Sequence, residues 1–204
     1  NFFGKNSINI DCTFTQEENL ADAIKRIQKE AEIAVRQGIT QIILSDKDLS
    51  SQKLPMPMLL CVGAINTFLI EKKLRGYVSI NVQSGEALDT HSFATLIGVG
   101  ATTINPYLAF DSLYQRHSKK LFGQFSFDEC IQRYIRSVNA GLLKIMSKMG
   151  ISVLSSYRGG CNFETVGLSR TVVDDYFPGV TSKISGIGLT GIEKKIREIH
   201  KEAF

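Results

Sequence analysis

The sequence predicts an α/β fold: repeated βα units around a mainly parallel sheet, with a partial or barrel-like architecture. Two observations lead to this prediction. Stretches with apolar residues at helical spacing end at a glycine, and short β-branched runs follow them several times along the chain. In addition, the 204 residues, 43% of them hydrophobic, can form one sizeable core but are fewer than the roughly 250 that a closed eight-stranded barrel needs. We therefore expect a single domain that spans residues 1–204.

The first half of the chain alternates between predicted strands and predicted helices. Thr15 and Glu18 have the spacing of a capping box, and the helix that they would begin ends at Gly38. Four short segments have the composition of strands: residues 7–14, 39–44, 77–82 and 102–105. Two further segments have the composition of helices: residues 57–74 and about 90–97. Helices between parallel strands imply right-handed crossover connections.

The second half is dominated by one long predicted helix over residues 127–149. Ser126 and Glu129 have the spacing of its capping box, and Gly150 ends it. A strand is predicted next, at residues 151–155. Two shorter helices follow, the first from a cap at Ser169 to Pro178, the second with a cap at Thr190 and Glu193.

Charge and hydropathy exclude several classes of function. The net charge of +4 and the pI near 8.8 are modest, and the basic residues are scattered apart from residues 116–120, which we interpret as a solvated loop. We therefore expect no nucleic-acid partner. No apolar run reaches the roughly 18 residues of a membrane span, and no signal peptide is present. We expect a protein of the cytoplasm or of an organellar stroma or matrix, neither membrane-bound nor secreted.

The four cysteines lie far apart and form no CxxC pair: Cys12, Cys61, Cys130 and Cys161. This spacing provides neither a zinc site nor a local redox motif, so reduced, mostly buried thiols are the expected state. The first residue is asparagine, and we expect the chain to be a segment excised from a longer polypeptide.

Ligands in βα folds gather at the carboxyl ends of the strands, so the loops at these ends are the candidate sites. Four loops qualify: residues 45–48, 83–86, 105–107 and 156–160. Asp46 and Asp48 in the first loop could hold a hard cation or do acid/base work, but two acids in a solvated turn are commoner, and we adopt that interpretation.

A group of polar residues, Glu86, Asp89 and His91, lies where a predicted strand passes into a helix. A histidine beside a carboxylate can act as a general base. The alternative is structural, because Asp89 is placed to cap the helix and the sequence assigns no nucleophile to the group. We therefore predict no catalytic residue.

Arg158, Gly159 and Gly160 are candidates for an anion site, because glycine N–H groups and a guanidinium together suit a phosphate. The sequence nevertheless lacks the GxGxxG and GxxxxGK(S/T) patterns of nucleotide-binding loops. A tight turn whose arginine bonds to carbonyl groups or to a neighbouring carboxylate is commoner, and we adopt that interpretation. No metal site and no cofactor site is predicted in this segment.

Several segments resemble one known family. They read SGEA at residues 84–87, KIMSKMGIS at 144–152, VGLSRTVVDDYFPG at 166–179 and SKISGIGL at 182–189. With these segments in order, the chain from about residue 14 to residue 204 resembles the central domain of the large subunit of glutamate synthase.

This resemblance implies a role inside a multidomain enzyme that converts glutamine and 2-oxoglutarate to glutamate. In that family an amidotransferase domain releases ammonia from glutamine, and an FMN-binding domain with an iron–sulfur cluster reduces the iminoglutarate. The central domain lies between these two partner domains, holds no flavin, and keeps their active sites and the ammonia tunnel in register. The resemblance therefore implies a noncatalytic structural and coupling domain.

Two features depart from the pattern of that family. Gly159, Gly160 and Cys161 stand where the family usually has Gly-Ala-Gln, and Ser92 stands where it has a second histidine. No catalytic residue of the family falls on this segment, and none of the four cysteines takes over a nucleophile or cluster role. The alternative function is an independent barrel-type domain that binds flavin or a phosphorylated ligand through residues 156–160 and 186–188.

Overall fold

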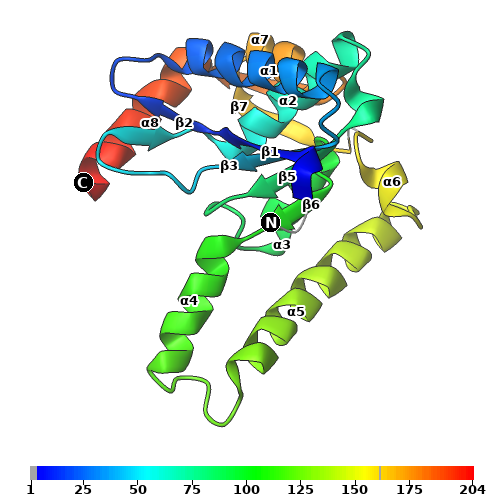
Figure 1. Cartoon of the computed structure of the whole chain (residues 1–204). Coiled ribbons are helices and arrows are strands. Elements are labelled where there is room, and N and C mark those ends of the chain that lie inside the picture. Colours follow the sequence, from blue (N-terminus) through cyan, green and yellow to red (C-terminus); the bar gives the residue numbers. More distant parts are fainter. Residues whose placement is uncertain (1–3, 161) are drawn as a thin grey trace.

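The computed structural model describes residues 4–160 and 162–204, which form a layered α/β structure with a helical hairpin projecting from it (Figure 1). Its main sheet has four parallel strands in the order β1-β3-β5-β6. These strands are β1 (Ser7–Asp11), β3 (Gln41–Ser45), β5 (Ser79–Gln83) and β6 (Thr103–Asn105). The arrangement confirms the predicted α/β fold with repeated βα units and a mainly parallel sheet.

Three helices connect these strands: α1 (Leu20–Arg36), α2 (Met58–Glu71) and α3 (Thr90–Gly98). Alternate strand positions form an apolar face, in which Ile10, Leu44 and Val82 lie side by side in the register. These residues share a buried core with α1 and α2, which lie along this face of the sheet (Figure 1). There are also two short 3-10 helices: η1 (Gly4–Asn6) directly precedes β1, and η2 (Arg75–Tyr77) lies between α2 and β5.

An antiparallel strand pair covers the carboxyl end of β1. It consists of β2 (Thr13–Thr15) and β4 (Lys53–Pro55). Lys53 forms an ion pair of 2.8 Å with Asp11, and the Arg26 guanidinium donates to the carbonyl oxygens of Asp11 and Thr13. The last helix, α8 (Leu189–Ala203), contacts both α1 and β4. The end of β1 is therefore closed by the chain itself.

The two remaining strands form a separate parallel pair, β7 (Glu164–Leu168) and β8 (Thr181–Ile187). Helix α7 (Arg170–Tyr176) joins them and packs on α2. This packing depends on Gly63, because a Cβ there would lie 2.5 Å from the Phe177 ring. Because β7 and β8 do not pair with any strand of the main sheet, the parallel strands do not close into a barrel. The arrangement is therefore partial and barrel-like.

Helices α4 (Tyr107–Ser118) and α5 (Phe127–Lys148) form the projecting hairpin, which we call the arm (Figure 1). Edge-to-face ring contacts join its two helices: Phe110 with Tyr134, and Tyr114 with Phe127. The arm meets the body at Gly141, where the Thr90 side chain of α3 occupies the space that a Cβ would need. A short helix, α6 (Leu154–Tyr157), follows α5. Among the described residues, no helix is both long and apolar enough to cross a membrane.

The cap of α5 confirms the sequence prediction. The Ser126 and Glu129 side chains accept hydrogen bonds from each other's backbone N–H groups, and Gly150 follows the helix with a φ of +70°. Ser169 caps α7 as predicted, by accepting a hydrogen bond from the Val172 N–H. These caps depend on residues close in sequence, which is why spacing alone predicted them.

The predicted start of the first helix is wrong. Thr15 lies in β2, and Asn19 caps α1 by accepting a hydrogen bond from the Asp22 N–H. Glu18 instead bonds to the Arg26 guanidinium at 3.1 Å. The predicted strand over residues 7–14 accordingly divides into β1 and β2, because Thr13–Thr15 pairs with β4 and not with the main sheet.

The predicted cap of the last helix is also wrong. Helix α8 begins at Leu189, directly after Gly188, so Thr190 lies inside the helix. Glu193 accepts a hydrogen bond of 2.9 Å from the Leu20 N–H at the start of α1. The carboxylate that was expected to cap its own helix therefore joins two helices that are far apart in sequence.

The strand predicted at residues 151–155 is absent from the structure. Residues 151–153 belong to no strand, and Leu154 begins α6. The Ile151 N–H donates to the Met146 carbonyl at the end of α5, and the Ile151 side chain packs in a small apolar cluster that includes Met146 and Tyr157. Ile151 therefore takes part in the packing between α5 and α6 and not in a strand.

Two further expectations failed where the sequence pattern was faint. Residues 116–118 form the last turn of α4 and are not part of a solvated loop. This helix was missed because Ala109 is its one buried residue, so the sequence shows no apolar stripe. Strands β7 and β8 were missed because glycines interrupt both of them, Gly167 in β7 and Gly186 in β8.

Candidate functional site

One face of the main sheet, opposite α1 and α2, carries polar side chains. We call it the inner face, and its residues include Gln41, Ser45, Asn81, Gln83 and Thr103. The Asn81 amide donates to Gln41 Oε1 at 3.0 Å, and its Oδ1 accepts from the Thr103 hydroxyl at 2.7 Å. The Ser45 hydroxyl donates to Gln83 Oε1 at 3.0 Å. Parallel sheets are usually apolar on both faces, so this face is suited to water or to polar groups.

The carboxyl ends of β3, β5 and β6 meet in a closed polar cluster around Asp46. This residue is 4% exposed, and its carboxylate accepts hydrogen bonds from the Ser84 hydroxyl at 2.6 Å and from the Gly85 N–H at 3.2 Å. The Tyr107 hydroxyl lies close to Gly85, and burial together with the Asp46 charge raises the pKa of Tyr107. We call these four residues the strand-tip cluster. They come from three of the four loops that the sequence singled out.

Asp46 and Asp48 have different surroundings, although they lie two residues apart. Asp48 is exposed, as the interpretation of a solvated turn requires, but Asp46 is buried, so that interpretation is wrong for Asp46. Asp46 directly follows a buried strand, and the next strand along the chain ends in the donors Ser84 and Gly85. This adjacency of strand ends is the signal that could have indicated the cluster from sequence.

Glu86 extends the polar region toward the start of α2. Its Oε2 accepts a hydrogen bond of 2.8 Å from the Met58 N–H, so this carboxylate caps α2, whose own preceding residue is a proline. Burial raises the pKa of the Glu86 carboxyl, the Met58 hydrogen bond opposes this rise, and the charge of Asp46 adds to it. A phosphate at these strand ends would face two carboxylates and a Gly85 N–H that is already bonded, so these residues do not fit a phosphate group.

The polar group predicted around Glu86, Asp89 and His91 is divided between different roles. Asp89 caps α3, as the structural alternative predicted, by accepting hydrogen bonds from the Ser92 N–H at 2.8 Å and the Ser92 hydroxyl at 2.7 Å. These bonds lower the pKa of Asp89. His91 is exposed and borders a groove beside Phe163, while Glu86 serves α2.

The turn formed by Arg158, Gly159 and Gly160 follows α6 and lies against the end of α3. Gly159, with a φ of +72°, donates its N–H to the Gly98 carbonyl at 2.8 Å, and the Gly160 N–H donates to the Tyr157 carbonyl at 3.1 Å. Both backbone donors are therefore used within the chain. The Arg158 Nε is buried and has no hydrogen-bond partner among the described residues. The candidate anion site consequently depends on Arg158.

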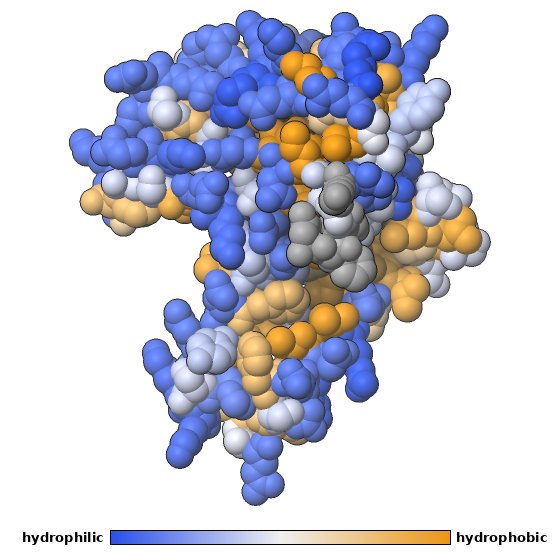
Figure 2. All heavy atoms as spheres, in the orientation of Figure 1, coloured by the Kyte–Doolittle hydropathy of each residue, from blue (hydrophilic) through white to orange (hydrophobic). Residues whose placement is uncertain are grey.

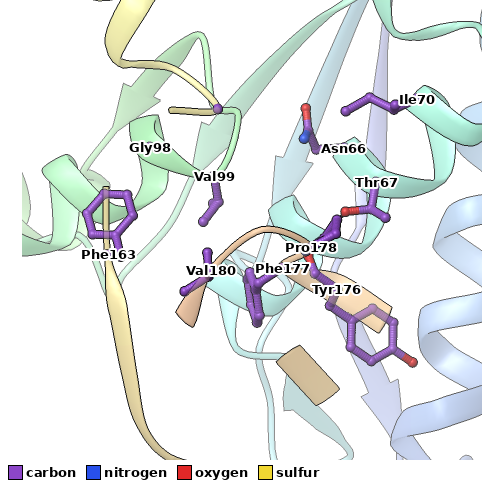
Figure 3. Close-up of a pocket in the computed structure, with 11 residues that line it drawn as sticks. Asn66, Thr67, Ile70, Gly98, Val99, Phe163, Tyr176, Phe177, Pro178 and Val180 are labelled. Atoms are coloured by element: carbon purple, nitrogen blue, oxygen red, sulfur yellow. The ribbon is translucent and has the colours of Figure 1, made fainter. Parts of the chain in front are cut away.

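A cavity of about 100 Å³ lies between α2, the end of α3 and residues 176–180 (Figure 3). Its apolar lining includes Val99, Phe163, Phe177 and Val180. Two polar side chains reach it from α2, and both are engaged: Asn66 Oδ1 accepts from Arg75 Nε at 2.6 Å, and the Thr67 hydroxyl donates to the Tyr176 carbonyl at 3.2 Å. Among the described residues no charged side chain lines the cavity, so it lacks a group that would orient a charged ligand.

The three cysteines that the structure describes form no metal or redox site. Cys12, Cys61 and Cys130 are buried, as expected, and are not joined by disulfides in the described part of the chain; Cys161 lies outside the described residues. The Cys61 thiol lies beside Cys12, and burial raises its pKa, so the reactive thiolate is disfavoured. In the part of the chain that the structure describes, no group of three or more His, Cys, Asp or Glu side chains could hold a metal ion.

Comparison with known proteins places the chain in a family. A family model described as glutamate synthase central domain matches residues 3–169. The chain belongs to the glutamate synthase central-domain family. The glutamate synthase (NADPH) large chain of Azospirillum brasilense is 49% identical to this central domain, over 100% of this chain and 14% of that one. The large chain of Bacillus subtilis is 44% identical, over 96% of this chain and 13% of that one.

The same relationship extends to other branches of the family. The chloroplastic ferredoxin-dependent glutamate synthase of Spinacia oleracea is 38% identical, over 92% of this chain and 12% of that one. The central domain described here therefore spans between 12 and 14% of the length of these curated relatives.

Solved structures confirm the barrel-like character of the central domain. DHODH from Eimeria tenella in complex with ferulenol aligns with a TM-score of 0.51 at 16% identity, over 76% of this chain and 38% of that one. A flavocytochrome b2 with sulfite bound aligns with a TM-score of 0.50 at 12% identity, over 71% of this chain and 38% of that one. At these identities the likeness shows the fold alone.

Proposed function

We propose that this chain is the noncatalytic central domain of a glutamate synthase, and that it couples an amidotransferase domain to an FMN-binding synthase domain of the same polypeptide. The strand-tip cluster is the main observation that supports this proposal. Ligands of βα folds bind at the carboxyl ends of the strands, but here the Asp46 carboxylate already accepts hydrogen bonds from the Ser84 hydroxyl and the Gly85 N–H. The chain's own side chains therefore occupy the usual ligand position.

The reaction of the parent enzyme divides between the two partner domains. The amidotransferase domain would release ammonia from glutamine, and the FMN-binding domain with its iron–sulfur cluster would use this ammonia to form glutamate from 2-oxoglutarate. A reactive intermediate is protected only where its path excludes water, so the two sites must stay at a fixed separation. The continuous buried core that joins the sheet, α1 and α2 supplies the rigidity for this purpose.

The inner face supports contact with partner domains. Its amides and hydroxyls bond to one another, and those that stay partly exposed, such as Thr103 and Gln83, can also bond to a neighbouring domain or to bridging water. We propose that the whole enzyme works in the cytoplasm or in an organellar stroma or matrix, without a nucleic-acid or membrane partner.

Partial-reaction kinetics of the full-length enzyme test the noncatalytic role. A general acid or base contributes about 10²–10⁴-fold to a rate. Glu86→Gln and His91→Ala should therefore leave the kcat of both glutamine hydrolysis and the synthase half-reaction close to wild type. Asp46→Ala, which breaks the strand-tip cluster, should instead lower the amount of glutamate formed per glutamine hydrolysed. A loss of about 100-fold in either half-reaction for Glu86→Gln or His91→Ala would contradict the proposal.

Flavin stoichiometry separates this function from the alternative of an independent flavin-binding or phosphate-binding domain. The full-length chain should bind a single FMN, and Arg158→Ala should not change that stoichiometry. A second FMN that is lost on Arg158→Ala would favour the alternative function.

A further inference from the structure

The positive charge of the chain is concentrated on the arm and the two residues that follow it. Residues 107–150 contain seven lysines and arginines and three acids, so they carry a net charge of +4, equal to that of the whole chain. The basic residues are Arg116, Lys119, Lys120, Arg133, Arg136, Lys144 and Lys148. Eight ion pairs form among the described residues, and none of them includes a residue of the arm. These cations are therefore available to a partner.

Helix α5 directs most of these cations to one side. Arg136, Lys144 and Lys148 follow one another at intervals of eight and four residues, which places them on the same side of a helix. The buried residues Val138 and Met146 lie on the opposite side, toward the body. Arg133, which shares the basic side, stacks on the Phe125 ring at 4.0 Å, whereas Lys144 and Lys148 are exposed.

Exposed apolar side chains adjoin this basic side at the base of the arm. Leu143, Met149, Val153 and Leu154 are 66, 43, 51 and 38% exposed. Hydrophobic atoms gather at the surface over α6 (Figure 2). We call this surface the arm-base patch, and its residues are Arg136, Leu143, Lys144, Lys148, Met149, Val153 and Leu154. An apolar centre with charges at its rim is typical of a protein–protein interface, and the patch lacks the aromatic residues that anchor proteins at a membrane surface.

We propose that the arm-base patch docks on an acidic surface with an apolar centre in another domain of the same polypeptide. This inference rests on the proposed function, because the central domain spans only 12 to 14% of its curated relatives and the rest of such a chain can supply the partner. A second copy of this domain would oppose like charges across the contact, which disfavours self-association. Partner carboxylates pair with Lys144 and Lys148, and apolar side chains cover Leu143 and Leu154.

Lysine footprinting of the full-length holoenzyme tests the inference. N-hydroxysuccinimidyl acetate modifies exposed amines, and mass spectrometry measures the rate at each lysine. Lys119 and Lys120, at the exposed tip of the same arm, are the internal reference. Docking should slow the acetylation of Lys144 and Lys148 about tenfold relative to this reference. Equal rates at all four lysines would overturn the inference.

Carbodiimide cross-linking identifies the partner. The reagent joins an amine directly to a carboxylate in contact, so Lys144 or Lys148 should be linked to an Asp or Glu of the same polypeptide outside residues 1–204. Links only within this segment, or only to a different protein, would overturn the inference, as would sedimentation of the holoenzyme with phosphatidylserine vesicles through these lysines.

A charge-reversal pair provides the matched control. Lys144→Glu with Lys148→Glu should accelerate hydrogen exchange of residues 143–154 in the full-length chain, whereas Lys119→Glu with Lys120→Glu should not. Equal exchange in the two variants would count against docking. The footprinting and exchange results do not depend on the half-reaction assays. If Glu86→Gln has normal kinetics but Lys144 and Lys148 are acetylated as fast as the reference lysines, the docking is refuted and the coupling function is not.

Discussion

At the scale of single residues, the absence of a Cβ at Gly63 decides how α7 meets α2. A methyl group there would lie 2.5 Å from Phe177 Cε1 and 2.7 Å from the Tyr176 carbonyl oxygen. We expect Gly63→Ala to lower the free energy of unfolding by about 2 kcal/mol, because overpacking outweighs the gain in helix propensity. Urea unfolding measures the effect. Gly76→Ala is the control, since no atom lies within 4 Å of where its methyl group would be, and it should change stability by less than about 0.5 kcal/mol.

Asp11 gives the stability of the domain a defined pH dependence. Burial raises its pKa, but hydrogen bonds from Lys53 and Thr13 and the Lys53 charge outweigh burial, so the folded pKa is lowered. A lowered pKa stabilises the fold above the unfolded value near about 4, and this stability is lost as the pH falls through the folded value. Asp11→Asn should cost about 1 kcal/mol at pH 7, since the ion pair is partly exposed. The difference in unfolding free energy should shrink in acid; a constant difference from pH 7 to pH 3 would contradict this assignment.

At the scale of elements, the close approach of α5 to α3 determines where the arm points. Thr90 Cγ2 lies 2.5 Å from the position of a Cβ at Gly141. Alanine in place of glycine normally stabilises a helix by about 1 kcal/mol, but here we expect Gly141→Ala to destabilise the domain by about 1 kcal/mol. Thr90→Ala in the same chain should restore most of this loss. Thermal unfolding of the single and double variants measures the coupling, and strict additivity would show that the two helices do not depend on this contact.

The secondary-structure elements also show that a local sequence pattern does not by itself predict a strand. The run at 39–44 and the run at 151–155 are both β-branched, yet the first forms β3 and the second joins two helices. The two runs differ in their tertiary environment. β3 lies between β1 and β5 in the main sheet, whereas Ile151 packs in a cluster with Met146 of α5 and Tyr157 of α6. The environment also decided the state of the candidate site residues. The structure brings together the loops at three of the strand ends that the pattern indicated, but the pattern did not predict that Asp46 is buried.

At the scale of the whole molecule, stability should be uneven. The main core includes residues from the sheet, α1, α2 and α7, while α5 buries only Cys130, Val138 and Met146. Native-state hydrogen exchange should therefore be slowest in β3, β5 and α2 and fastest near the tip of the arm, around residues 116–126. Exchange at the tip as slow as in β5 would show that the arm shares the main cooperative unit.

The sequence by itself determined the α/β class, the crossover helices, the capping box of α5 and the resemblance to the glutamate synthase central domain. These features depend on residues that are close together along the chain, so spacing and motif reveal them. Only the tertiary structure decided that β7 and β8 pair apart from the main sheet, that the inner face of the sheet is polar, and that Asp46 closes the strand ends. These properties arise where segments far apart in sequence meet, and no local pattern specifies which segments those will be.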